Sequence, residues 1–140
     1  MKMEMSNFRI QPEEYNKAHS ILTSLFESSH ALLASIISRS GQEIACCCDH
    51  PIIDRTALAA LAASNLAATF GIAELIEETE FKRVYHRGKS KSILMVPIGD
   101  HFFLLLVFPN SVRSADSLRS VKSAVSLLND LFTGREETDG

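Results

Sequence analysis

Histidines with acidic neighbours are the first residues in this 140-residue chain that could perform chemistry. The five histidines are His19, His30, His50, His86 and His101. Two of them directly follow an aspartate, in Asp49-His50 and Asp100-His101, so the two pairs could meet as a metal site or as an acid–base pair. An aspartate beside a histidine is also commonplace in turns. Both pairs fall at expected turns, so we favour the interpretation that they are loop polar residues.

The three cysteines are consecutive, at Cys46, Cys47 and Cys48. Successive side chains of a strand point to opposite faces, so these thiols cannot converge on one metal as a spaced pair would. We expect small, partly buried free thiols of the kind found in a reduced cytosol.

Short catalytic motifs are missing from the sequence. It contains no G-x-S-x-G nucleophile turn, no G-x-x-x-x-G-K-[ST] phosphate loop, no H-E-x-x-H zinc motif and no G-x-G-x-x-G dinucleotide turn. We therefore expect a protein that is not an enzyme and that uses no cofactor and no metal.

One stretch of the chain concentrates positive charge. Its cationic residues are Lys82, Arg83, His86, Arg87, Lys89 and Lys91. Cations keep an edge strand soluble, and that is the favoured interpretation. A docking patch for an acidic protein surface is the second. Nucleic acid is disfavoured because only Phe81 and Tyr85 interleave with the cations, and the formal net charge of the chain is −3.

The length fits one domain, which we place at residues 11–133, with an N-terminal tail at 1–10 and a C-terminal tail at 134–140. The first residues hold no apolar stretch of signal-peptide length. A cytoplasmic location is the expectation.

The periodicity of apolar residues predicts helices and strands in the order helix, two strands, helix, three strands, helix. The helices are expected at residues 12–28, at 55–78 with Asp54 as the cap, and from Ser114 to Gly134. The strands are expected at residues 31–38, 43–48, 80–87, 92–98 and 101–108. The last strand is apolar on both faces and should lie in the middle of the sheet. Tight turns between the strands imply antiparallel pairing, hence an α+β fold with helices layered on a mostly antiparallel sheet.

The central helix is unusual because residues 56–73 include no ionisable side chain. A helix without a charged face is normally buried, and in so short a chain a second molecule would have to supply part of the cover. The run is nearly long enough to span a membrane. We exclude insertion because polar residues and glycine interrupt the run and alanine contributes little transfer energy.

At about 100° per residue the helix has two faces. The bulky face, expected to pack on the chain's own sheet, carries Leu58, Leu61, Asn65, Ala68, Ile72, Leu75 and Ile76. The other face, expected to contact a second copy, carries Ala59, Ala63, Leu66, Ala67 and Phe70, with Ala60 and Ser64 at its shoulder. Ridges of small residues let two helix backbones come close, so a homodimer through this face is predicted. The alternative is an alanine-rich solvent face, which would leave Leu66 and Phe70 exposed.

Four segments carry a resemblance to a known family: the hairpin around Ser40-Gly41, the helix start Ala57-Leu-Ala-Ala-Leu-Ala-Ala63, the strand Phe81-Lys-Arg-Val-Tyr-His86, and Gly99-Asp-His-Phe-Phe-Leu-Leu-Leu106. They resemble the Roadblock (dynein light chain) family over residues 22–131. The chain looks most like the prokaryotic members of MglB type, which regulate Ras-like small GTPases.

The resemblance implies a homodimer and a profilin-like or longin-like αββαβββα fold, in which a five-stranded, mostly antiparallel sheet has helices on both faces. In family dimers the third strands pair across the two-fold axis and the central helices pack together, which adds Phe81, Arg83 and Tyr85 to the expected interface. Such pairing brings Lys82 and Arg83 near their copies, and Glu78 and Glu80 can offset that repulsion.

By the same resemblance the protein binds a Ras-like small GTPase and changes its rate of hydrolysis. An arginine supplied in trans, from Arg55 or Arg83, is one route; reordering of the GTPase's switch loops is the favoured one. Candidate partner-binding residues are Arg55, Glu74, Lys82 and Arg87. The alternatives are an adaptor of the dynein-light-chain type and a ligand-sensing module. The latter needs a pocket with convergent polar groups, which strands this apolar do not promise.

Overall fold

The computed structural model describes residues 3–5, 8–49, 54–79, 81–112 and 114–139, with side chains for residues 10–49, 54–79, 81–112 and 117–133. The helices are α1 (Pro12–Ser29), α2 (Arg55–Leu75) and α3 (Ser114–Asp139). The strands of the main sheet are β3 (Leu33–Ser38), β4 (Glu43–Cys48), β5 (Val84–Arg87), β6 (Lys91–Ile98) and β7 (Phe102–Pro109). Two short strands, β1 (Met3–Met5) and β2 (Phe8–Ile10), form a separate antiparallel hairpin before α1. The sequence interpretation placed this hairpin in a tail and missed it.

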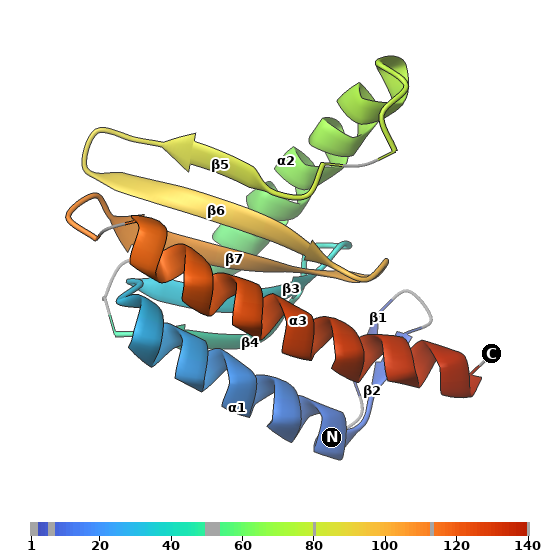
Figure 1. Ribbon diagram of the computed structural model, residues 1–140. Coiled ribbons are helices and arrows are strands. Elements are labelled where there is room, and N and C mark those ends of the chain that lie inside the picture. The colour runs from blue at the N-terminus through green and yellow to red at the C-terminus, as the bar shows by residue number, and fades with distance from the viewer. Residues whose placement is uncertain (1–2, 6–7, 50–53, 80, 113, 140) are drawn as a thin grey trace.

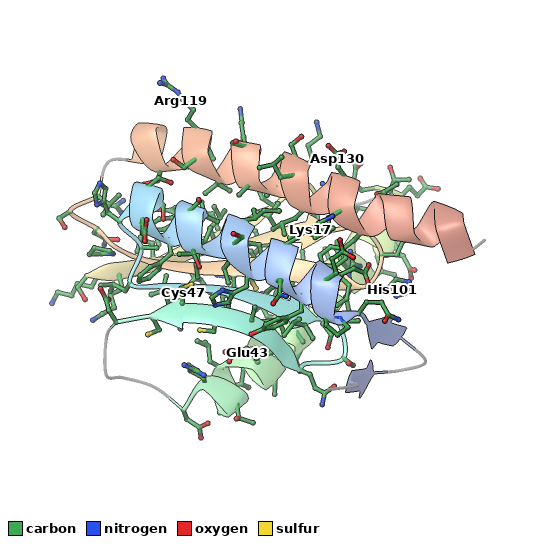
Figure 2. All side chains as sticks on the ribbon, turned by 90° about the horizontal axis from the view of Figure 1, so that it is seen from below. Lys17, Glu43, Cys47, His101, Arg119 and Asp130 are labelled. Carbon is green, nitrogen blue, oxygen red and sulfur yellow. The ribbon has the colours of Figure 1, made fainter. Side chains whose placement is uncertain are left out.

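The molecule has three layers (Figure 1). The middle layer is a five-stranded antiparallel sheet in the order β4-β3-β7-β6-β5. Helices α1 and α3 lie side by side on one face of the sheet, and α2 lies on the other, as Figure 2 shows from below. The predicted α+β class, the helix–strand order from α1 onward and the helices on both faces are confirmed.

Strand β7 is the centre of the sheet, as predicted. It pairs with β3 on one side and β6 on the other, so that Leu104 lies opposite both Ile36 and Val96. All seven residues from Phe102 to Phe108 are buried. A strand covered on both faces has no solvent side, which explains its continuous apolar sequence.

Alternation along the strands divides the interior into two cores. Leu104, Leu106 and Leu128 belong to the core under α1 and α3. Leu105, Met95 and Leu66 belong to the core under α2. The second core is the one that orients α2, and α2 is where the candidate site lies.

Local signals in the sequence set several element ends correctly. The Asp54 carboxylate accepts a hydrogen bond from the Ala57 N–H at 3.0 Å, so Asp54 caps α2 as predicted. The β3–β4 turn has Gly41 at a φ of 99°, a conformation that a side chain would disfavour.

Three predicted boundaries are wrong. Helix α2 ends at Leu75, not at residue 78, because the chain reverses through Glu77 at a φ of 61°. Strand β5 was expected to begin at residue 80, which lies outside the described residues. The strand begins at Val84. Helix α3 continues through Gly134 to Asp139, since a glycine in a helix costs only about 1 kcal/mol and does not forbid it.

Candidate self-association surface

The orientation of α2 on the sheet is the reverse of the one predicted. Its buried residues are small ones together with a single leucine: Ala59, Ala62, Ala63, Leu66 and Ala73. Leu66 is 1% exposed and belongs to the core under α2. The predicted dimer residues Ala59, Ala63 and Leu66 are therefore covered by the chain's own sheet and cannot contact a partner helix.

The reason for the reversed orientation is the volume that the strands already supply. On this side the sheet presents Leu33, Ile37 and Phe103, all fully buried. A helix that packs on such a surface needs small residues to reach native packing density. The β3–β4 turn also lies close to the helix, because a Cβ at Gly41 would be 3.4 Å from the Ala60 Cα.

Most of the bulky face of α2 consequently points away from the protein, whereas Leu58 is partly buried against the core under α2, as predicted. Leu61 is 69% exposed, Ile72 55% and Leu75 85%, and Ile76 is exposed beside them. The C-terminal part of α2 extends beyond the sheet, past the edge formed by β5 (Figure 1). Exposed apolar side chains gathered on one uncharged face indicate a surface that another molecule covers.

By length and composition alone, α2 could also cross a membrane. Its inner face, however, is part of the core under α2. Leaving the sheet would expose Leu66 and the strand residues beneath it. A cover that leaves α2 on the sheet, such as a protein surface, therefore fits the fold better than insertion.

The other α2 residues predicted to contact a second copy lie at the border between the buried face and the outward face. Ala60, Ser64 and Ala67 are exposed, so they remain available to a partner. Phe70 is half-buried, and the Arg39 guanidinium lies over its ring, 4.6 Å from the centroid. Arg39 also donates to the Gly99 carbonyl at 2.9 Å, which anchors this contact to the sheet.

Strand β5 is the second exposed feature, because it is an edge of the sheet and pairs on one side only, with β6. Tyr85 and Arg87 are exposed on it, and Lys82 and Arg83 are exposed just before it. Phe81 is partly buried. The open backbone edge and the overhanging end of α2 lie at the same end of the molecule (Figure 1).

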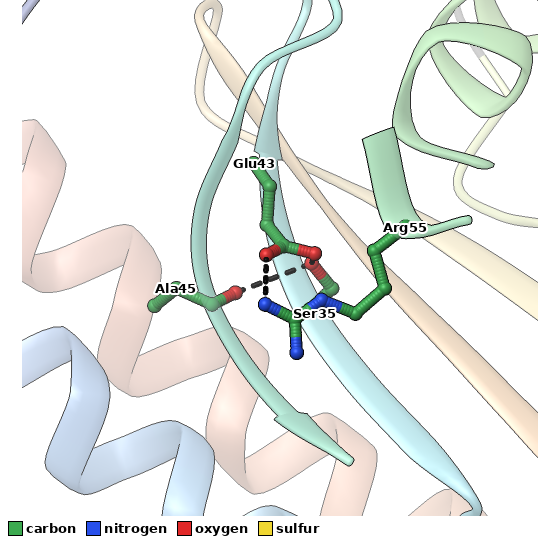
Figure 3. A network of polar contacts seen from close by, with 4 residues as sticks. All are labelled: Ser35, Glu43, Ala45 and Arg55. Carbon is green, nitrogen blue, oxygen red and sulfur yellow. Dashed lines mark hydrogen bonds and ion pairs between the residues drawn. The ribbon is translucent and has the colours of Figure 1, made fainter. Parts of the chain in front are cut away.

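Two of the predicted partner-binding residues belong to α2. Glu74 is exposed near the end of the helix. Arg55 begins the helix, and its guanidinium lies 3.2 Å from the Glu43 carboxylate. Glu43 in turn accepts a hydrogen bond from the Ser35 hydroxyl, which lies 3.2 Å from the Ala45 carbonyl as well (Figure 3). Arg55 therefore ties α2 to β4.

The cysteines alternate between the two cores, as expected for a strand. Cys46 and Cys48 pack against the core under α2 and Cys47 against the core under α1 and α3, and all three are free thiols. Burial and then the negative charge of Glu43 raise the pKa of Cys46 from its ordinary 9.0 to about 12, while Arg55 opposes the rise. The Cys46 thiol is therefore held protonated.

This protonation predicts slow alkylation of Cys46. Only the thiolate reacts, so iodoacetamide at a pH of about 8.5 should label Cys46 at least about tenfold more slowly in the folded chain than in urea. Peptide mass spectrometry gives both rates. Stability should fall as the pH rises above 9, because the unfolded thiol then loses its proton and the folded one does not. Equal labelling rates would contradict the assignment.

Among the residues that the structure describes, the other ionisable side chains form no metal centre. Within the described ranges, no group of three histidine, cysteine, aspartate or glutamate side chains is placed to hold a metal ion. The Asp49-His50 pair cannot be compared with Asp100-His101, because His50 lies outside the described residues.

Comparison with known proteins finds a matching family model and several similar solved structures. A model of the Roadblock/LC7 domain matches residues 17–108. MglB of Myxococcus xanthus is 30% identical, with a TM-score of 0.85 over 89% of this chain and 94% of that one. An MglB structure described as a tetrameric arrangement is 26% identical, with a TM-score of 0.81 over 87% and 92%. Profilin II of Acanthamoeba castellanii, 14% identical with a TM-score of 0.58 over 80% and 96%, shares the fold alone, which confirms the profilin-like architecture. A search of the curated proteins finds no match.

Proposed function

The chain belongs to the Roadblock/LC7 family and is of MglB type, and on that basis we propose that it is a homodimeric, non-enzymatic regulator of a Ras-like small GTPase in the cytoplasm. The observation that supports a dimer is the outward face of α2. Leu61, Ile72 and Leu75 are exposed on it, and residues 56–73 include no charged side chain. Burying such side chains against a second copy contributes about 1.5–3 kcal/mol for each one that becomes fully covered.

A two-fold axis would let one partner copy cover both exposed features, the outward face of α2 and the open edge of β5. Antiparallel pairing of β5 with its copy would join the two sheets and remove the open edge. The same axis would bring the overhanging ends of the two α2 helices together on one face of the joined sheet. The MglB structure described as tetrameric is consistent with self-association in this family.

Charge at the proposed strand pairing needs compensation. Lys82 and Arg83 would approach their copies, and repulsion between like charges across a strand pair is destabilising. Glu77 and Glu78 are exposed between α2 and β5 and are placed in the sequence to offset it. High ionic strength, which screens exposed charges, should therefore not weaken the dimer.

For the action on the GTPase we favour reordering of its switch loops over an arginine supplied in trans. Arg55 would have to leave the Glu43 carboxylate to act in trans, and that ion pair holds the start of α2 on β4. Arg83 would lie close to its copy, beside the proposed two-fold axis.

Single-turnover hydrolysis of GTP by a Ras-like GTPase from the same organism tests this function. We expect the rate to rise at least about tenfold with the protein present. An Arg55→Gln chain should retain the acceleration if switch reordering is the route and lose it if Arg55 acts in trans. Binding without any change in rate would replace the proposal with an adaptor role, and no binding would remove the GTPase as a partner.

A further inference from the structure

A cavity of about 430 Å³ lies on the sheet face opposite α2, between β5, the ends of β6 and β7, and the first turns of α3. Its size is within the range of small-ligand pockets. The proposed dimer uses the outward face of α2 and the backbone edge of β5, neither of which lines the cavity. Arg83 and Tyr85 are expected at the dimer interface as well, so they would line the cavity beside the two-fold axis.

The floor of the cavity is apolar. Leu94 of β6, Phe108 of β7 and Val121 of α3 line it, and all three are buried members of the core under α1 and α3. Leu118 adds a partly buried side chain from the next turn of α3. A hydrocarbon or aromatic group entering here would replace water on an apolar surface.

One wall of the cavity is cationic. Tyr85 and Arg87 line it together because alternate residues of a strand share a face, and Arg83, just before the strand, lines it as well. Between them, Val84 packs into the core under α2 on the opposite side of the sheet. Among the side chains that the structure describes here, the lining includes two guanidinium groups and no carboxylate.

The polar groups of this wall are held in place. The Ser92 hydroxyl donates to the Asn110 side-chain oxygen at 2.6 Å, and the Asn110 amide donates to the Gly88 carbonyl at 2.9 Å. Helix α3 begins at Ser114, close to Ser117, which lines the cavity. A helix N-terminus favours negative charge nearby.

We propose that this cavity binds an organic anion, an apolar group that carries one carboxylate. The carboxylate lies between Arg83 and Arg87, where guanidinium groups bind it by charge-assisted hydrogen bonds, and the apolar group rests on Leu94 and Phe108. Two sources share this chemistry: the C-terminal end of a protein segment whose last residue is large and apolar, and a free small organic acid.

The test is calorimetric titration of the full chain with N-acetyl-phenylalanine and with its uncharged amide. The carboxylate should bind, and the amide should bind at least about tenfold more weakly, since the two differ only in the charged group. A hexapeptide ending in Leu-Phe separates the sources. If it binds at least about tenfold more tightly than N-acetyl-phenylalanine the ligand is a chain end, and if it binds equally the ligand is a small acid.

Two variants of equal charge locate the site. Arg87→Gln should weaken carboxylate binding at least about tenfold, whereas Lys89→Gln, which removes a cation outside the cavity, should leave it within about twofold. Equal binding of acid and amide, equal losses in the two variants, or no binding of either probe up to about 10 mM would overturn the proposal. Sedimentation of the same samples measures dimer formation independently. A loss of ligand binding can therefore be distinguished from a loss of the dimer.

Discussion

An Ile72→Glu chain is expected to sediment as one chain of 15.5 kDa at concentrations where the unmodified protein sediments as two. Ile72 lies on the outward face of α2 with more than half of its side chain exposed, so the change should leave the fold of a single chain intact. In a symmetric dimer each copy would bury a carboxylate against apolar side chains. An unpaired polar group costs about 1–3 kcal/mol, so two of them should weaken the dimer about 30-fold or more.

The control for this prediction is Ser126→Glu on α3. Ser126 is exposed on a helix that covers the opposite face of the sheet, so this variant adds the same charge away from the proposed interface. It should sediment as the unmodified protein does. Dissociation of both variants, or of neither, would show that the outward face of α2 is not the surface that joins the copies.

Leu66→Ala is expected to lower the free energy of unfolding of a single chain by about 3 kcal/mol, whereas Leu61→Ala should change it by less than about 0.5 kcal/mol. The two leucines lie on opposite faces of α2, with Leu66 buried and Leu61 mostly exposed. Removing the buried side chain leaves a cavity against Phe103 and Leu105. Removing the exposed one leaves nothing unfilled within the chain.

Urea unfolding measures both values. The two variants should be compared in the Ile72→Glu background, where dissociation does not contribute to the unfolding free energy. The reverse ranking, with Leu61→Ala the more damaging, would mean that the bulky face packs on the sheet after all.

Most of the fold could be predicted from the sequence because its signals are local. Continuous apolar residues in β7 require cover on both faces, and Asp54 supplies an acceptor at the start of a helix. Alternation along β5 places Tyr85 and Arg87 on one face, and Arg83, just before the strand, lines the same cavity.

The orientation of α2 could not be predicted because both of its faces are uncharged. Periodicity separates the face of Leu66 from the face of Leu61, but the side-chain volume of Phe103 and Leu105 decides which of them fits against the sheet. The expectation that bulk belongs inside was therefore wrong. The size of the side chains on the facing strands was the signal that could have corrected it.

The cavity beside β5 was missed for a related reason. The strands of the sheet core are uniformly apolar, and on that ground no pocket with convergent polar groups was expected. The polar groups come instead from the edge strand and from Asn110 at the end of β7, and the first turns of α3 bring them into one concave surface. That arrangement depends on where α3 crosses the sheet, which no local pattern specifies.

Amide hydrogen exchange along β5 shows whether a second copy covers both the outward face of α2 and the open edge of β5. In the unmodified protein at about 100 µM, the outward N–H groups of Val84–Arg87 should exchange slowly, and in the Ile72→Glu chain they should exchange rapidly. The other edge strand, β4, has no proposed partner and provides the reference within the same sample. Rapid exchange along β5 in the unmodified protein, equal to that in Ile72→Glu, would mean that no second copy covers this edge.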